Sequence, residues 1–247
     1  MLRGKPISLT VMDYGLFKVH QNGRVIGICG FLIQTDAGER VLIDTGFPQK
    51  YAEDGAQAAA EDGLGSFGVL LDLDARHMPR AQLQLCGLTP SDIDLLIITH
   101  GHIDHIGHIA GFPGTPIVMG ADERALPRPS YFGNVQPMDW PKAEYRLLKA
   151  DTEIGPGFRV LMAPGHAPGQ LAFMIDLPQT GAVLLTSDAI SRPEEVTEGF
   201  KGTQDHLTAQ ASAARILALA QAREAMVIYG HCPAQWPELR KAPEAYG

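Results

Sequence analysis

Nine runs of apolar and β-branched residues divide the chain and predict β-strands. Several of these runs are apolar at nearly every position instead of alternating with polar residues, which is typical of strands in a sheet whose two faces are both covered. Glycines and prolines punctuate the chain throughout. The runs cover residues 7–14, 28–35, 40–46, 94–100, 116–120, 158–166, 170–177, 182–188 and 225–231.

Helical patterning is clearest at 206–222 and next clearest at 79–88, where Gly87 suits the end of a helix. Two stretches, 61–80 and 127–145, are harder to assign, and we expect long surface loops or short irregular helices there. No repeat, low-complexity tract or obvious linker occurs, so residues 1–247 are expected to form a single domain. Strands that outnumber helices, in sheets with covered faces, indicate a layered α/β (α+β) fold.

Composition and charge narrow the choice of partners. Hydrophobic residues make up 45% and charged residues 19% of the chain, the balance of a compact protein with a sizeable core. The formal charge is −8 and no run of Lys or Arg offsets it locally. Because a polyanion is repelled by such a surface, nucleic acid is not an expected partner.

The termini and the cysteines bear on location. The N-terminal residues contain no uninterrupted apolar run of the kind that exported proteins carry, and no later segment approaches the length of a membrane span. The three cysteines, Cys29, Cys86 and Cys232, are scattered and lack C-x-x-C spacing, so a disulfide framework is not expected. We therefore expect a cytoplasmic protein that does not associate with membranes.

The candidate chemistry lies at the ends of the predicted strands. "THGHIDH" places His100, His102, Asp104 and His105 just after one strand, where a turning backbone can direct alternating side chains into one cavity. Three other strand-like runs end at metal-capable residues, and these are His166, Asp188 and His231. Imidazoles and carboxylates are ligands that Zn²⁺ accepts. A polar loop with histidines by accident would not explain the three further strand-end residues, so the pattern predicts a metal site.

Other residues of these types carry weaker signals. Asp44 also ends a strand-like run, and its carboxylate could orient a ligand histidine. His108 is expected to be a loop residue or a support for a ligand, and Cys232 a small buried apolar residue. The remaining histidines have no partner signal and are expected to be exposed or satisfied by neighbours; they are His20, His77 and His206.

Together, "THGHIDH", "APGHAPGQ", "TSDA" and "YGH" resemble the successive motifs of the metallo-β-lactamase superfamily. The intervals between His105, His166, Asp188 and His231 are 61, 22 and 43 positions. These intervals are similar to those of the N-acyl homoserine lactone lactonases, the quorum-quenching branch. "VLIDTG" and "VLLTSDA" also resemble that branch.

This resemblance implies a four-layer αβ/βα sandwich with a dinuclear metal site at one edge. By the same resemblance, His100, His102 and His166 would hold one metal. Asp104, His105 and His231 would hold the other, and Asp188 would bridge the two. The implied cofactors are two divalent metal ions, with Zn²⁺ as the expected metal.

Two such cations lower the pKa of a shared water, so that hydroxide can attack a carbonyl near neutral pH. The expected activity is hydrolysis of a carboxylic ester, a lactone similar to an N-acyl homoserine lactone, with Asp104 or Asp188 as the proton carrier. The expected partner is a small-molecule lactone or ester, and a homodimer is left open.

Three alternatives also stay open. A thioester hydrolase of the glyoxalase II type and an iron-dependent persulfide dioxygenase belong to the same superfamily. The third is a metal-stabilised binding protein without activity.

The chain departs from the lactonase pattern at two places. The lactonases carry a tyrosine three residues after the bridging aspartate, where it helps to position the lactone carbonyl, whereas this chain has Ser191. The segment 124–147, which includes Trp140, also differs. We expect that the metals polarise the carbonyl alone or that another tyrosine, such as Tyr131, has taken over the role.

Overall fold

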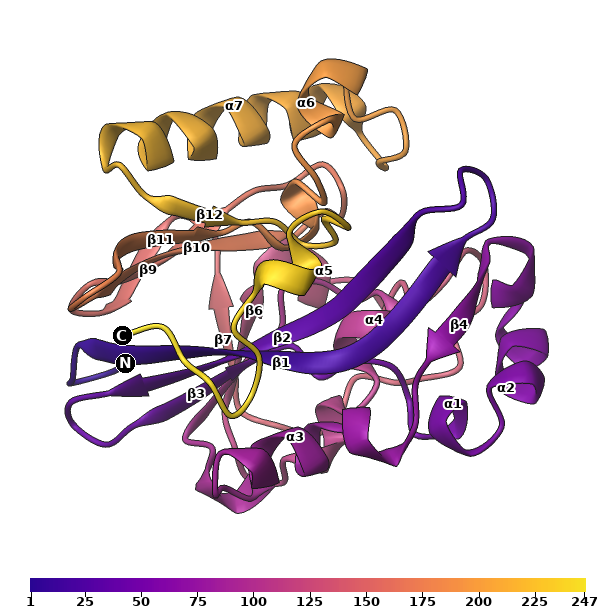
Figure 1. Cartoon of the computed structure of the whole chain (residues 1–247), viewed down its shortest axis with the longest axis horizontal. Helices are drawn as coiled ribbons and strands as arrows, with labels where there is room; N and C mark the ends of the chain where they lie inside the picture. The colour runs from indigo at the N-terminus through magenta and orange to yellow at the C-terminus, as the bar shows by residue number, and fades with distance from the viewer.

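Two β-sheets form the centre of the protein, and the computed structural model describes all of residues 1–247 (Figure 1). The larger sheet has the strand order β4-β1-β2-β3-β5-β6-β7, and the smaller has the order β12-β11-β10-β9-β8. The strands are β1 Pro6–Val19, β2 Val25–Thr35, β3 Arg40–Ile43, β4 Gly68–Asp72, β5 Leu95–Ile97, β6 Ile117–Gly120, β7 Tyr145–Leu148, β8 Thr152–Gly155, β9 Phe158–Met162, β10 Leu171–Leu177, β11 Gly181–Leu185 and β12 Met226–Ile228. The α-helices are α1 Lys50–Glu53, α2 Gly55–Asp62, α3 Pro79–Leu85, α4 Ile103–Ile106, α5 Ala121–Arg124, α6 Glu195–Glu198 and α7 His206–Ala222. Short 3₁₀ turns are η1 Leu64–Ser66, η2 Ala75–His77, η3 Pro90–Asp92, η4 Ile109–Gly111, η5 Ser187–Ala189 and η6 Trp236–Glu238.

The apolar strands bury both of their faces, as the sequence predicts. In β2, Phe31 and Ile33 face the smaller sheet, whereas Leu32 faces the opposite side of the larger sheet. Successive side chains of a strand point to opposite faces, so an almost continuous apolar run fits a strand that is covered on both sides. One apolar cluster, which includes Phe31, Ile33, Phe173 and Val183, therefore fills the space between the two sheets.

Helices cover the outer faces of both sheets. Leu83 of α3 and Ile106 of α4 pack against the outer face of the larger sheet. Ala213 and Ile216 of α7 pack against the outer face of the smaller sheet, and Figure 1 shows α7 lying along that sheet. The four layers confirm the predicted αβ/βα sandwich.

Most predicted elements are confirmed, and three strands were missed. The helix at 206–222 coincides with α7. The stretch 61–80, expected to be loop or irregular helix, also contains β4, and β7 and β8 were not predicted at all. These three strands are short and partly exposed, so each offers too few buried positions to produce a clear pattern. The stretch 127–145 is irregular until β7 begins, as expected.

The two ends of the chain meet on β1. The backbone of Leu9 exchanges two hydrogen bonds with that of Tyr246, at 2.9 and 2.8 Å. Tyr246 also packs in the cluster between the sheets. Because both ends contribute to one core, we infer that residues 1–247 form one domain. None of the helices combines the length and apolar character that crossing a membrane requires.

Candidate metal centre

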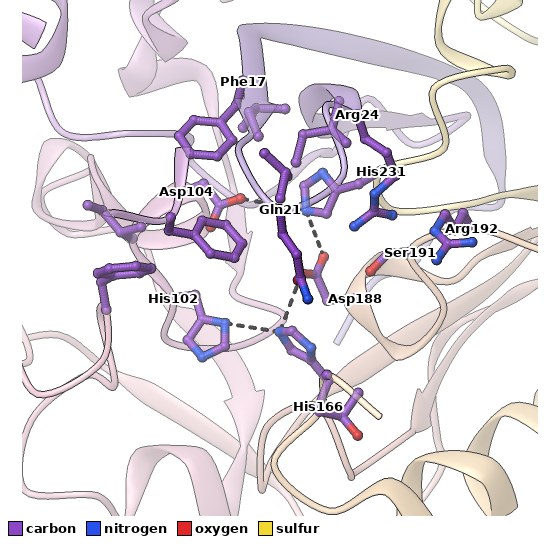
Figure 2. Close-up of a pocket in the computed structure, with 18 of the residues that line it drawn as sticks. Phe17, Gln21, Arg24, His102, Asp104, His166, Asp188, Ser191, Arg192 and His231 are labelled. Carbon is purple, nitrogen blue, oxygen red and sulfur yellow. Dashed lines mark hydrogen bonds and ion pairs between the residues drawn. The ribbon is translucent and has the colours of Figure 1, made fainter. Parts of the chain in front are cut away.

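Seven side chains from distant segments meet at one edge of the two sheets. His100 lies three residues after β5, His166 lies four residues after β9, and Asp188 lies in η5 just after β11. His231 lies three residues after β12. His102, Asp104 and His105 follow His100 at the start of α4. The structure thus brings together every residue that the sequence proposed as a ligand, and Figure 2 shows five of them around one cavity.

Three imidazole nitrogens converge in the first group of this cluster. His102 Nδ1 lies 2.9 Å from His100 Nε2 and 3.0 Å from His166 Nε2. Asp188 approaches the same group through Oδ2, which lies 3.4 Å from His166 Nε2 and 4.0 Å from His100 Nε2. Three ring nitrogens and one carboxylate oxygen suit a tetrahedral Zn²⁺ site.

The second group uses the other oxygen of the same carboxylate. Asp188 Oδ1 lies 3.4 Å from His105 Nε2 and 3.1 Å from His231 Nε2. Asp104 Oδ2 lies 3.6 Å from His105 Nε2 and 3.5 Å from His231 Nε2. Asp188 therefore faces both groups with one oxygen each.

Hydrogen bonds on the far side of the rings fix which nitrogen faces the cluster. His231 Nδ1 donates to the carbonyl of Gly27 at 2.9 Å, and His105 Nδ1 donates to Asp44 Oδ2 at 2.8 Å. Thr99 holds Asp44 in place through its backbone N–H and its hydroxyl, both at 2.8 Å. These bonds direct the Nε2 atoms of both histidines into the cluster, and the expected supporting role of Asp44 is confirmed.

Two atoms of the second group lie close to other atoms of the cluster but make no hydrogen bond. His105 Nε2 and Asp188 Oδ1 are buried and make no hydrogen bond. With Nδ1 of His105 donating to Asp44, Nε2 of the neutral ring presents a lone pair toward Asp188 Oδ1. Such an arrangement is costly unless a positive charge lies between them. The residues present therefore fit a bound cation.

The pKa shifts of the cluster agree with this geometry. Burial lowers the pKa of His100 well below its usual value and that of His102 to about 3, which leaves both rings neutral. Burial also acts to lower the pKa of His231, but Asp188 and Asp104 more than offset it and raise the pKa to about 9. Burial opposes the ionisation of Asp188, yet His231 and His105 hold its pKa well below the usual value. The second group thus attracts positive charge, and the first offers neutral nitrogen ligands.

Glu123 supports the cluster by binding two of its loops, and no sequence pattern predicted this role. Its carboxylate, fully buried on α5, accepts a hydrogen bond from the backbone N–H of Gly101 at 2.8 Å and another from that of Gly169 at 3.2 Å. Gly101 lies between His100 and His102, and Gly169 lies three residues after His166. One carboxylate therefore joins the two loops that carry the first group.

A cavity of about 900 Å³ opens above the cluster. His102, Asp104, His166, Asp188 and His231 form its floor (Figure 2). One wall is apolar, and its side chains include Phe17, Ile26, Phe47, Phe67 and Phe132. The other side is polar, with Arg24, Ser191, Arg192, Glu195 and Glu198, and Figure 2 shows Gln21 between Asp104 and this side. The site can therefore hold a small molecule that has an apolar part and a polar part.

The remaining histidines and Cys232 behave as the sequence suggested. The backbone N–H of His108 donates to Thr45, and its ring lies 3.1 Å from the sulfur of Met78, outside the ligand groups. His77 is buried and accepts a hydrogen bond from Asp74 N–H, whereas His20 and His206 are exposed. Cys232 is buried and belongs to none of the ligand groups.

Tyr131 does not point at the cluster. Its hydroxyl donates to Asp62 Oδ2 at 2.7 Å, and Tyr51 donates to the same oxygen at 2.9 Å. The backbone of Tyr131 instead supports the ligand loop, because its N–H donates to Gly101 and its carbonyl accepts from Ile103. The suggestion that Tyr131 replaces the tyrosine of the lactonases is not supported by this geometry.

Comparison with known proteins places the fold and the cluster in one family. The family model described as the metallo-beta-lactamase superfamily matches residues 30–231, which include all seven clustered residues. The chain belongs to the metallo-beta-lactamase superfamily. This membership confirms the resemblance inferred from the motifs, and with the cluster it indicates divalent metals as cofactors.

Curated relatives and solved structures place this chain near the lactonases of the superfamily. The N-acyl homoserine lactonase AiiA of Bacillus thuringiensis subsp. kurstaki is 29% identical over 228 residues, which cover 87% of this chain and 84% of that protein. The N-acyl homoserine lactonase AttM of Azorhizobium caulinodans is 32% identical over 182 residues, which cover 67% of this chain and 68% of that protein. A crystal structure of a Bacillus thuringiensis AiiA variant with N-decanoyl-L-homoserine bound at the active site has a TM-score of 0.84 and 26% identity, and covers 99% of this chain and 100% of that one. The prediction of a metal-dependent hydrolase of the lactonase type is confirmed.

Proposed function

We propose that this metal-dependent hydrolase opens lactones similar to N-acyl homoserine lactones and uses two divalent metal ions, with zinc as the expected metal. His100, His102 and His166 would hold one ion, and Asp104, His105 and His231 would hold the other. Asp188 would be shared by the two ions. The substrate comes from the relatives, whose names describe N-acyl homoserine lactonases.

The position of Asp188 is the observation that carries the two-metal proposal. Its Oδ2 faces His166 at 3.4 Å, and its Oδ1 faces His231 at 3.1 Å. A carboxylate that serves a single ion would not need to be surrounded by histidines on both sides. A mononuclear iron site, as in the persulfide dioxygenases, would leave part of this ligand set without a role.

The chain's own residues would orient the substrate and deliver a proton to the departing alkoxide. Two bound divalent cations supply hydroxide near neutral pH and stabilise the charge that develops on a carbonyl oxygen. The side chain of Asp104 is 16% exposed and lines the cavity, so it can pass a proton to the departing alkoxide. Asp188 is more enclosed, at 8% exposure, and has both oxygens directed at histidines, so Asp104 is the better placed carrier. The apolar wall of the cavity suits the acyl chain of such a lactone.

Metal analysis beside a substrate panel tests this function. We expect close to two zinc ions per chain, and faster opening of a γ-lactone with an N-acyl chain than cleavage of a glutathione thioester or a penicillin. One iron and no zinc would favour the dioxygenase instead. Faster thioester cleavage would favour the glyoxalase II type, and two bound metals without hydrolysis of any ester would indicate a binding protein.

Location and assembly are also proposals. We propose a cytoplasmic location, which is supported by three cysteines that remain as free thiols. A homodimer stays a prediction, and sedimentation equilibrium of the metal-loaded protein tests it.

A further inference from the structure

The polar wall of the cavity brings two arginines close to Ser191. Arg24 lies immediately before β2, where the turn of the β1–β2 hairpin ends, and Arg192 follows Ser191 directly in sequence. Both line the cavity, and Figure 2 shows Arg24, Ser191 and Arg192 on the side of Asp188 away from His102. Two cationic side chains therefore face one region beside the metal centre.

The charge of Arg192 is already balanced within the chain. Its Nη1 donates to Glu194 at 3.3 Å, and its Nη2 donates to Glu198. The side chain is only 13% exposed, so these two carboxylates hold it in place. Arg192 therefore lines the cavity, but its charge is already neutralised by two carboxylates and contributes little to the binding of a ligand.

Arg24 has no such partner. No carboxylate oxygen lies within ion-pairing distance of its guanidinium, and its Nε and Nη1 are buried without a hydrogen bond. Glu195, which also lines this wall, accepts a hydrogen bond from the backbone N–H of Ser191 at 2.7 Å instead. Burial and the neighbouring charge of Arg192 lower the pKa of Arg24 from its usual value, although the more distant carboxylates Glu195, Glu198 and Glu194 oppose that shift.

Arg24 offers two unused hydrogen-bond donors to a ligand in the cavity. The residue as a whole is only partly buried, so water still solvates part of its charge, but Nε and Nη1 are shielded from water and would gain hydrogen bonds from an anion that enters the cavity. A planar guanidinium matches a carboxylate better than it matches a neutral oxygen, because a charge-assisted pair is about twice as strong as a neutral hydrogen bond.

We propose that Arg24 binds a carboxylate carried by the substrate, so that the preferred lactones of this enzyme are anionic. This inference rests on the proposed lactonase function and narrows its substrate class. The carboxylate lies on the polar side of the cavity, beside Ser191, while any apolar part of the substrate lies against the phenylalanines of the opposite wall. Arg24 acts as a specificity residue and takes no part in the bond-breaking step.

A matched pair of substrates tests the proposal. The two are N-acyl γ-lactones of equal chain length, one with a terminal carboxylate and one with the corresponding primary amide. With the zinc-loaded wild-type protein we expect kcat/KM for the carboxylate to exceed that for the amide at least about tenfold. Arg24→Met keeps much of the length and removes the charge, so this ratio should fall to about one. Arg24→Lys, which keeps the charge, should give an intermediate ratio.

Controls separate this inference from the function on which it rests. Arg223 pairs with Asp176 on the surface and does not line the cavity, so Arg223→Met should keep the wild-type ratio. If wild-type protein opens neither lactone, the proposed function fails. If it opens both equally, or if Arg24→Met lowers both rates alike, the function stands and the carboxylate site is wrong. Stimulation of amide-lactone opening by added acetate in wild type but not in Arg24→Met would show a free anion as the ligand, which also overturns the proposal.

Discussion

Asp188 is the residue on which the two halves of the metal centre depend. Its two oxygens face different histidine groups, and one of them, Oδ1, is buried without any hydrogen bond. Replacement by asparagine would keep the volume but place an amide N–H₂ where one lone pair is needed. The amide cannot ligate through that nitrogen, so only one side of the bridge would survive.

We therefore expect Asp188→Asn to lower the metal content from two ions toward one and to reduce lactone kcat/KM by at least about a hundredfold. Elemental analysis of the purified variant and initial-rate kinetics measure both effects. Asp176→Asn is a matched control, because Asp176 is partly exposed on β10 and pairs only with Arg223. A variant at position 188 that retains two ions and full turnover would show that Asp188 does not bridge.

Ser191 lies beside the metal centre, where the lactonases carry a tyrosine. Its backbone supports the cluster, since its carbonyl accepts a hydrogen bond from the N–H of His231 at 2.8 Å, but its side chain is much shorter than a tyrosine. We expect Ser191→Ala to change lactone kcat/KM by less than about tenfold, which corresponds to about 1.4 kcal/mol. A larger loss, with metal content unchanged, would mean that the serine hydroxyl contacts the substrate.

Tyr131→Phe is the companion measurement. The hydroxyl of Tyr131 donates to the buried Asp62, and its loss leaves Asp62 with Tyr51 and Lys50. We expect a loss of about 1 kcal/mol in the free energy of unfolding and little change in kcat/KM, because the backbone contacts of Tyr131 to the ligand loop remain. Denaturant melts and kinetics on the same preparation separate the two effects. A large loss of kcat/KM without a loss of stability would mean that the hydroxyl of Tyr131 contacts the substrate.

Sequence patterns located the seven clustered residues but not every residue that holds them in place. His100, His166, Asp188 and His231 were recognisable because each ends an apolar run, and His102, Asp104 and His105 because they lie within five positions of His100. Asp44 was recognisable for the first of these reasons. Glu123 was not, since its two contacts lie 22 and 46 positions away and a glutamate after a strand is ordinary in a surface loop.

At the scale of elements, Glu123 connects α5 with the loops after β5 and β9. Its carboxylate accepts from two backbone N–H groups, and burial raises its pKa although Gly169 and Gly101 oppose that shift. A glutamine has one acceptor oxygen and one N–H₂ group, so Glu123→Gln would turn one of these contacts into a clash between two donors. The loops that carry His102 and His166 would then be held less firmly.

We expect Glu123→Gln to weaken the binding of one of the two metals at least about tenfold while the other binds almost normally. Stepwise removal by a chelator, followed by elemental analysis, measures this difference. Glu153→Gln on the exposed side of β8 is the matched control. Equal weakening of both metals, together with a lower melting temperature, would mean that Glu123 supports only the fold.

The burial of each strand explains why some elements were predictable and others were not. Strands β2, β3, β5 and β10 are buried on both faces, so their apolar runs are strong signals. Strand β4 pairs only with β1 at the edge of the larger sheet, and its Val69 and Leu71 are exposed. Its position depends on the long β1 strand beside it, which is information that the local sequence does not contain.

The two sheets both contribute residues to each group of the metal centre. The larger sheet carries the loop with His100 to His105, and the smaller carries the loops with His166, Asp188 and His231. Without a cation, the second group brings Asp104 and Asp188 together with two buried histidines. Protons then have to provide the positive charge that a metal would otherwise supply, so the stability of the metal-free protein should depend on pH.

The sign of that dependence follows from His231, whose pKa is raised to about 9 in the folded chain against about 6.5 when unfolded. A raised pKa contributes stability that is fully present below pH about 6.5 and is lost as the pH rises through about 9. We therefore expect the melting temperature of the metal-free protein to fall between pH 6.5 and 9. Metal binding displaces the same protons, so metal affinity should rise over this range and level off above it.

Thermal melts of metal-free and zinc-loaded protein at pH 6.5 and 8.5 measure both trends together. The gap between the two melting temperatures should be wider at pH 8.5, because the metal-free form has lost stability there and the metal no longer competes with protons. His206→Asn removes an exposed histidine outside the cluster and should reproduce the wild-type curves. A gap that stays constant with pH would mean that the protons on the histidines of the second group are not exchanged for metal, and that this half of the centre binds its ion by other residues.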